Sequence, residues 1–512
     1  MFLIDTTTLL LREFPNSDQR YAILSHTWGC SSDEVTYEEM VAPERSAMTQ
    51  AKPGYAKVVK TCDIARTEYN LPYAWIDTCC INKSSSAELS ESINSMFRWY
   101  HNAGVCLAYL SDVGDGQVTF SESRWFTRGW TLQELIAPKD LVFLNCKWEF
   151  LGTRGAKAAE ISTITRIPTQ VLNHTHELSD IPIAQRFSWA STRETTRVED
   201  CAYSLLGIFD INMPMLYGEG RKAFVRLQEH ILSQSDDMSL FLWNDLQASQ
   251  EYTGLLAPSP GCFHEMHDVT AEPTFTQRDY QLTNRGIRLK VGLAWDVETG
   301  LAVLPVNHSL RLKFGSNREP AGIYLRRVGL DLFARARPQE CAAIETSTRH
   351  TDFTAVRTLA KAQSAMIEAT VIKVSVSSDI SIVKVEPKGS YNPKEQVLHA
   401  GHTGAFIGFM KFEFGFYSQP FTVVFCFKGL HWFATVVHGQ RWYALQDKFY
   451  SYYKDHLDEI NNDDTVESTT IGRIYGVGGG SVVVHMRGGI NPTIDVRTTP
   501  SWIPYAEVRS CQ

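Results

Sequence analysis

The chain has 512 residues, of which 44% are hydrophobic and 21% are charged. These proportions are close to globular averages, so a disordered or fibrous protein is excluded. The 49 lysine and arginine residues and the 57 aspartate and glutamate residues give a net charge of −8, which offers no basic surface for nucleic acid or an anionic membrane. At roughly 150 residues per domain, the length predicts about three domains.

The cysteines and the N-terminal residues indicate the cellular compartment. The 11 cysteines are scattered along the chain, and no pair has the CxxC spacing. This pattern argues against a disulfide framework and a thiolate zinc site, and it predicts reduced thiols and no metal. The first residues lack the features of a signal peptide, and no window approaches the roughly 18 apolar residues of a membrane span. We therefore expect a cytoplasmic protein without a membrane segment.

The first 150 residues alternate short apolar runs with helical patterns, which is typical of βαβ units and a parallel sheet. Strands are expected at Tyr21–Ser25, Tyr73–Asp77, Val105–Leu110 and Leu141–Leu144. Helices are expected around Tyr55–Ala65, around Leu89–Tyr100 after a capping box at Ser85 and Glu88, and at Trp130–Ile136 before Pro138. Right-handed crossovers would place these helices on both faces of an open, doubly wound sheet.

The rest of the chain changes character twice. Residues 151–243 are expected to be nearly all helical, and the last helix would carry Ala223, Phe224, Leu227 and Ile231 on one face. Beyond residue 250, short β-branched segments bounded by Gly, Pro, Asn and Asp predict strands. The expected organisation is an α/β domain at 1–150, a helical extension at 151–243 and a β-rich domain at 250–512.

Polar side chains follow the predicted strands at the edge where open parallel sheets bind ligands. The first strand runs into Ser25, His26 and Trp28, and the second ends in Asp77. Glu134 lies four residues after Trp130 and so on the same helical face. If the topology is right, these six residues converge on one edge of the sheet. The alternative for Asp77 is a cap of the following turn, and tryptophans such as Trp28 and Trp130 are more often core residues than platforms for a ligand.

Two other kinds of site are weighed against this one. His26 with Cys79 or Cys80 could form a nucleophilic pair across two strand ends, although buried structural cysteines are common. His174 and His176 could bind a metal but lack a partner cluster, so a loop is the better interpretation.

Three sequence blocks resemble the motifs of the fungal heterokaryon-incompatibility (HET) domain. They are Tyr21–Gly29, Tyr73–Asn82 and Arg124–Leu135, and Arg193–Asp200 and Met215–Phe224 resemble the helical stretch that accompanies the domain. The resemblance covers roughly residues 1–243. It implies a module that triggers programmed cell death when genetically different fungal cells fuse, and therefore an allelic or non-self protein partner.

The order of strands and helices in this region is also similar to TIR domains, several of which cleave NAD. This kinship implies a TIR/flavodoxin-like fold, with NAD as the candidate substrate and no cofactor. The catalytic glutamate of those domains matches Glu134, within Trp130–Leu135. A glutamate near its ordinary pKa of about 4.3 would be ionised at pH 7 and could stabilise a ribosyl cation.

In this hypothesis Ser25, His26 and Asp77 orient ribose or pyrophosphate, and Trp28 or Trp130 stacks on a ring. The alternative function is a non-catalytic signalling module that forms homo-oligomers and recruits partners through the same surface. In either case, the large β-rich region is expected to restrain or sense, because a death effector has to be held inactive in resting cells.

Overall fold

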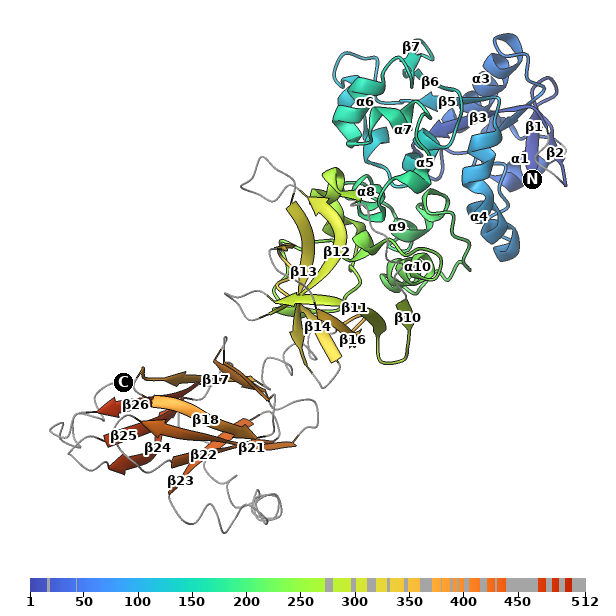
Figure 1. Cartoon of the computed structure of the whole chain (residues 1–512). Helices are drawn as coiled ribbons and strands as arrows, with labels where there is room; N and C mark the ends of the chain where they lie inside the picture. Colours follow the sequence, from blue (N-terminus) through green and yellow to red (C-terminus); the bar gives the residue numbers. More distant parts are fainter. Residues whose placement is uncertain are drawn as a thin grey trace.

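The computed structural model describes the chain except for a set of short stretches. These are residues 16–18, 43, 272–279, 296–300, 311–318, 329–331, 345–348, 360–370, 379, 387–389, 394–395, 400–404, 415–420, 429–430, 439–467, 476–480, 488–492 and 500–512. The described parts form a mixed α/β region followed by a strand-rich region, and the two occupy opposite ends of the molecule (Figure 1).

The N-terminal region is built on a seven-stranded sheet in the order β2-β1-β4-β3-β5-β6-β7. Its strands are β1 (Phe2–Asp5), β2 (Leu11–Glu13), β3 (Tyr21–His26), β4 (Tyr73–Trp75), β5 (Val105–Tyr109), β6 (Leu141–Leu144) and β7 (Phe150–Thr153). The inner strands β4, β3, β5 and β6 are parallel, and the outer ones pair antiparallel. The four predicted strands are confirmed at the centre of the sheet. Every residue of β3 is buried, as a parallel strand covered on both faces requires.

Helices lie on both faces of this sheet, with α3 above and α4 below it in Figure 1. They are α1 (Tyr37–Val41), α2 (Ala47–Gln50), α3 (Pro53–Thr67), α4 (Ser86–Asn102) and α5 (Thr131–Ile136), with 3₁₀ turns η1 (Phe120–Glu122) and η2 (Arg124–Thr127). The Ser85 side chain caps α4 by accepting a hydrogen bond from the Glu88 amide, as predicted. Tyr100 of α4 donates to the carbonyl of Leu24, which fixes this helix beneath β3.

The following residues are helical up to about position 241. The elements are α6 (Ala158–Thr165), α7 (Thr169–Leu172), η3 (Leu178–Asp180), α8 (Ile183–Ser188), α9 (Asp200–Tyr203), η4 (Leu206–Ile208), α10 (Lys222–Leu232) and η5 (Met238–Phe241). The predicted apolar face of α10 is buried. Glu199 accepts hydrogen bonds from the amides of Gly218 and Gly220, which connects the two sequence motifs of this region.

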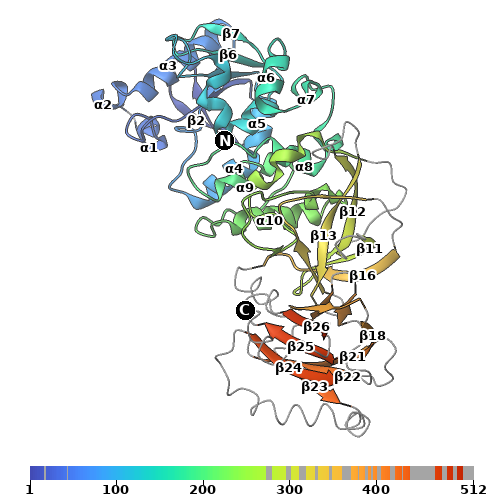
Figure 2. The ribbon, with the colours of Figure 1, turned by 90° about the vertical axis from the view of Figure 1, so that its left-hand side faces the viewer.

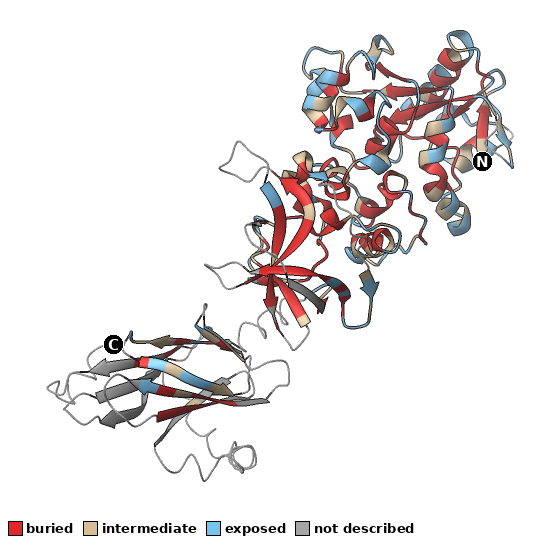
Figure 3. Cartoon of the chain, in the orientation of Figure 1, coloured by how far each residue is buried: buried red, intermediate tan, exposed pale blue. Residues whose placement is uncertain are grey.

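A small β-barrel comes next. Its elements are β8 (Tyr252–Thr253), η6 (Pro260–Asp268), β9 (Thr270–Ala271), β10 (Tyr280–Leu282), β11 (Ile287–Trp295), β12 (Ala302–Leu310), β13 (Glu319–Arg327), β14 (Leu332–Ala336), β15 (Ala342–Ala343) and β16 (Arg349–Ala355). The ring closes because β11 pairs with both β12 and β16, and β14 links β16 to β13. One continuous core extends from Leu3 to Ala355 and so joins the first sheet, the helices and the barrel (Figure 3).

The C-terminal strands form a separate pair of sheets. A six-stranded sheet has the order β19-β20-β17-β26-β25-β24, and a four-stranded sheet has the order β18-β21-β22-β23. The strands are β17 (Val371–Val376), β18 (Ile380–Glu386), β19 (Tyr391–Asn392), β20 (Val397–His399), β21 (Ala405–Phe414), β22 (Phe421–Lys428), β23 (His431–His438), β24 (Ser468–Tyr475), β25 (Ser481–Arg487) and β26 (Thr493–Thr499). Their buried core begins at Ile372 and is distinct from the first core. Figure 2 shows this body beyond the barrel.

Across the described residues, no helix combines the length and the apolar character needed to cross a membrane.

Candidate functional site

Ser25 and Glu134 meet beneath the carboxyl edge of the parallel sheet. Ser25 is near the end of β3, and its Oγ donates a hydrogen bond of 2.5 Å to Oε2 of Glu134 on α5. The indole nitrogen of Trp125 donates to the same Oγ at 2.8 Å, and the Tyr100 hydroxyl also hydrogen-bonds the glutamate. Ser25 belongs to the strand that pairs with β5, where the order of the parallel strands reverses and open sheets bind ligands.

Burial controls the charge of Glu134, which is only 5% exposed. Loss of solvent, together with the negative charge of Asp77, raises the pKa of the Glu134 carboxyl to about 8. The hydrogen bond from Ser25, the nearby Tyr100 hydroxyl and the Arg193 charge oppose this rise without cancelling it. The expectation of an ionised glutamate at pH 7 is therefore wrong for this enclosed state, because the sequence does not report the depth of a side chain.

His26, Trp28 and Asp77 form a second cluster beside the first. Nε2 of His26 lies 3.1 Å from Oδ1 of Asp77, and the Trp28 indole donates to Oδ2 at 2.8 Å. Burial raises the pKa of Asp77, but the hydrogen bond from His26, with smaller contributions from Lys83 and Trp28, outweighs it and leaves the pKa lowered. The Asp77 carboxylate therefore forms hydrogen bonds with side chains at and just after the end of β3, which a cap of its own turn would not require.

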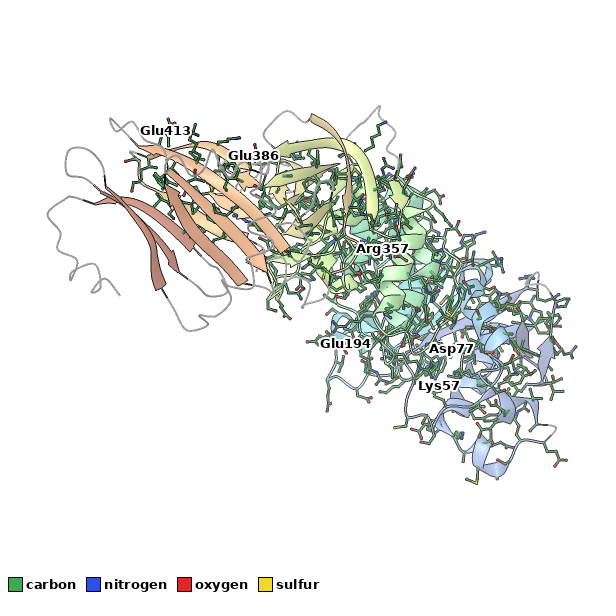
Figure 4. The ribbon with its side chains drawn as sticks, turned by 90° about the horizontal axis from the view of Figure 1, so that it is seen from below. Lys57, Asp77, Glu194, Arg357, Glu386 and Glu413 are labelled. Atoms are coloured by element: carbon green, nitrogen blue, oxygen red, sulfur yellow. The ribbon has the colours of Figure 1, made fainter. Side chains whose placement is uncertain are left out.

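Two residues that sequence reasoning missed extend this cluster. The ammonium group of Lys57 lies 3.2 Å from Nδ1 of His26 and 2.6 Å from Oε1 of Glu34. Because an ammonium group can only donate, Nδ1 accepts, and Nε2 is left to donate to Asp77. Lys57 and Asp77 accordingly lie close together in Figure 4. Lys57 is on the first part of α3 and Glu34 is in a loop, so neither position carries a spacing signal.

The tryptophans near the site lie in different environments. Trp28 is 47% exposed, and the Lys83 ammonium lies 3.9 Å from its ring centre. Trp130 hydrogen-bonds the carboxyl group of Asp200 in the helical extension. Trp125, which was not predicted as a site residue, is fully buried and covers Ser25.

The cysteine alternative is contradicted by burial. Cys79 and Cys80 are both buried, and loss of solvent raises the pKa of the Cys80 thiol well above its usual range. His26 is hydrogen-bonded by Asp77 and Lys57 and has no nitrogen left to act as a base for either thiol. The described residues also contain no group of three or more potential metal ligands. His174 instead contacts the carbonyl of Ile136.

Arg193 of the helical extension anchors the start of α5, the helix that carries Glu134. Its Nη1 donates to the Thr131 hydroxyl and to the Arg128 carbonyl, both at 2.9 Å, and its Nε donates to the Trp189 carbonyl at 3.1 Å. Burial lowers the pKa of this guanidinium to about 9. The extension therefore closes over the N-terminal end of α5.

A pocket of about 250 Å³ opens at the same edge of the sheet, beside the two clusters. It is lined by Thr27, Trp28 and Gly29 after β3, by Arg124 and Arg128 before α5, and by Thr196 of the extension.

Comparison with known proteins finds a family match in the N-terminal region. Residues 21–123 match the family model of the heterokaryon incompatibility protein (HET). The chain therefore carries a HET domain, as fungal heterokaryon-incompatibility proteins do. It is 45% identical over 222 residues to the vegetative incompatibility protein HET-E-1 of Podospora anserina. That alignment covers 41% of this chain and 16% of the relative, so the chain spans only a small part of that protein's length.

Solved structures give a weaker likeness. Two structures of the lectin XCL of Xerocomus chrysenteron, one wild-type and one with methionine substitutions, are 17% identical to the chain and align with a TM-score of 0.19. The alignments cover 25% of this chain and 95% or 96% of the lectin. At this TM-score the likeness supports no conclusion about fold or function.

Proposed function

We propose that the chain is an effector of vegetative (heterokaryon) incompatibility that causes programmed cell death by hydrolysing NAD at Glu134. The HET domain and the identity with a vegetative incompatibility protein support the biological role. The observation that carries the chemistry is the Ser25–Glu134 pair at the strand reversal between β3 and β5. Numbered along the chain, the parallel strands have the order 2-1-3-4, which agrees with a flavodoxin-like arrangement and with the proposed kinship to TIR domains.

The proposed reaction breaks the bond between C1′ of the ribose and N1 of nicotinamide. The bond's electron pair goes to N1, so nicotinamide leaves as a neutral molecule without help from an acid, and the ribose passes through an oxocarbenium-like state. Ionised Glu134 stabilises that positive charge, and Ser25 holds the carboxylate in place. Water then adds to C1′ and loses a proton, which gives ADP-ribose.

The structure contains Glu134 in an enclosed state. Ser25 and Trp125 are fully buried against it, and Arg193 clamps the segment from Arg128 to Thr131. Substrate therefore reaches the carboxyl group only after this segment moves outward. In the proposal, self-association or a protein partner causes this movement, and the β-rich region restrains it in resting cells.

The direct test is NAD loss over time with the purified full chain across a range of protein concentrations. Glu134→Gln and Glu134→Ala are expected to reduce turnover at least about 100-fold, because one preorganised electrostatic contact contributes about that much. Glu160→Gln is the matched control, since Glu160 pairs with Lys157 on the surface of α6. Equal turnover in the Glu134 variants and the unmodified chain would remove Glu134 from the mechanism.

The second candidate is a non-catalytic signalling module that oligomerises and recruits partners through the HET domain. The enclosed Glu134, whose raised pKa keeps it neutral at pH 7, favours this function. Light scattering on the same samples separates the two proposals. Concentration-dependent assembly without NAD loss at any concentration supports the signalling module, whereas NAD loss that accompanies assembly supports the hydrolase.

A further inference from the structure

We propose that the pocket beside Trp28 is the subsite that binds the pyrophosphate group of a nucleotide diphosphate, through Arg124 and Arg128. The inference rests on the proposed function only for the choice of a dinucleotide as substrate. The pocket itself is defined by its lining residues and its volume of about 250 Å³.

The charge of the pocket is the first argument. Arg124 is exposed and Arg128 is half-buried, and among the described residues neither guanidinium forms an ion pair with a carboxylate. Their side-chain partners are hydroxyl groups, since Nη2 of Arg124 lies 3.4 Å from Oγ of Ser111 and Nη2 of Arg128 lies 3.3 Å from Oγ1 of Thr196. Two guanidinium groups that have no ion-pair partner among the described residues border one pocket, and this arrangement favours an anionic ligand.

In the enclosed state, hydrogen bonds hold the backbone at both ends of the segment that carries these arginines. The Asp112 carboxylate accepts hydrogen bonds from the Arg124 amide and the Ser123 hydroxyl, each at 2.8 Å. Arg193 holds the Arg128 carbonyl at 2.9 Å. The backbone at both ends of the segment is therefore fixed, while both guanidinium groups border the pocket. A planar guanidinium matches two phosphate oxygens at once, so this arrangement favours a phosphate-bearing ligand.

The remaining lining and the size of the pocket narrow the choice of ligand. Trp28 contributes an indole ring that is 47% exposed, with its nitrogen anchored on Asp77. Such a ring can stack on a nucleobase or cover a ribose. A volume of about 250 Å³ is below the range of about 300–1,000 Å³ for whole small-molecule sites. The pocket thus fits one part of a dinucleotide, and the reacting ribose would extend toward Glu134 when the covering segment moves.

The test is isothermal titration calorimetry of ADP with the full chain. Arg124→Gln and Arg128→Gln are each expected to weaken ADP binding at least about 10-fold. Arg20→Gln is the matched control, because Arg20 is an exposed arginine just before β3, at the opposite edge of the sheet. Melting temperatures of the variants should stay close to that of the unmodified chain, since both guanidinium groups lie at the surface.

Titrations with pyrophosphate and with adenosine show which part of ADP supplies the binding affinity. Pyrophosphate alone should bind more weakly than ADP and show the same dependence on both arginines, whereas adenosine alone should bind without it. Absence of ADP binding, or ADP binding that Arg124→Gln and Arg128→Gln leave unchanged, would overturn the inference. Glu134→Gln separates this inference from the proposed function, because it should bind ADP normally and lose NAD turnover. Arginine-dependent ADP binding in a chain that never consumes NAD would refute the hydrolase and retain the subsite.

Discussion

Two buried polar regions of the molecule place an ionisable side chain in opposite environments. At the junction between the helical extension and the barrel, Arg335 donates to the carbonyls of Phe241 and Trp243, and its guanidinium lies over the Trp243 ring. At the edge of the HET sheet, Glu134 meets hydroxyl groups and the negative charge of Asp77. A buried guanidinium that donates to main-chain carbonyls connects two parts of the fold, whereas a buried carboxyl group with a strongly raised pKa is typical of functional sites.

Other contacts strengthen the junction. Gln228 of α10 donates to the Ala257 carbonyl and accepts from its amide, both at 2.9 Å. Arg357 forms an ion pair with Glu229 at 2.6 Å, at the place labelled in Figure 4. Because these contacts connect α10 to residues beyond 250, the HET region and the barrel share one core, while the C-terminal sheets have their own.

The largest effect should come from truncating the chain, either after the barrel or before it. A chain ending at Leu359 keeps the barrel and is expected to be monodisperse. A chain ending at Trp243 loses the partners of Trp243 and Gln228 and exposes their core surface, so it should aggregate. Size-exclusion chromatography with light scattering measures both. A monodisperse, folded chain ending at Trp243 would contradict the shared core.

A single substitution at the junction should have the next largest effect. Arg335→Met removes the guanidinium donors of two buried carbonyl groups and the contact with the Trp243 ring, and we expect it to lower the free energy of unfolding by about 3–5 kcal/mol. Urea denaturation measures the change. Arg337→Met is the control, because Arg337 pairs with Glu340 near the surface and should contribute less than about 1 kcal/mol. Equal effects of the two substitutions would show that the junction is not tightly packed.

Glu134→Gln, unlike Arg335→Met, should raise the free energy of unfolding, and it should do so only at higher pH. In the folded chain the pKa is about 8, whereas in an unfolded chain it is about 4.3. Between these values the folded state keeps a proton that the unfolded state has released, so the stability of the unmodified chain falls as pH rises. The glutamine side chain does not ionise, and the variant should be more stable by about 2–4 kcal/mol at pH 8.

The gain from Glu134→Gln should disappear near pH 4.5, where Glu134 is protonated in both states. Thermal unfolding followed by circular dichroism at several pH values gives the comparison, with Glu160→Gln as the surface control. A gain that is the same at pH 5 and pH 8 would mean that Glu134 is ionised in the folded chain throughout this range.

The central sheet was predictable from sequence because its strands are short, mostly apolar runs that alternate with helices. β3 and β6 are buried along their whole length, and such runs are typical of parallel strands with both faces covered. The edge strands β1, β2 and β7 were not predicted. The two-residue strands β8, β9 and β15 were not predicted either, because their pairing depends on contacts far away in the sequence.

The location of the candidate site could be predicted from the sequence, but the contacts between its side chains could not. The rule that ligands bind at the carboxyl ends of parallel strands selected Ser25, His26 and Asp77 correctly as neighbours of that edge. Helical spacing put Trp130 on the same face as Glu134, yet its indole bonds Asp200 of the extension. Trp125, Lys57 and Arg193 were missed because each reaches the site from another element, and only the packing of these elements brings them together.

The most direct test of the account is the pH dependence of nicotinamide release by the full chain, measured as kcat/KM, which reports ionisations of the free protein. If ionised Glu134 stabilises the ribosyl cation, kcat/KM should rise about 10-fold per pH unit below a pKa near 8 and then level off. Glu134→Gln should show only background release at every pH. A rate that is independent of pH between 6 and 9, or equal release by Glu134→Gln, would contradict the account.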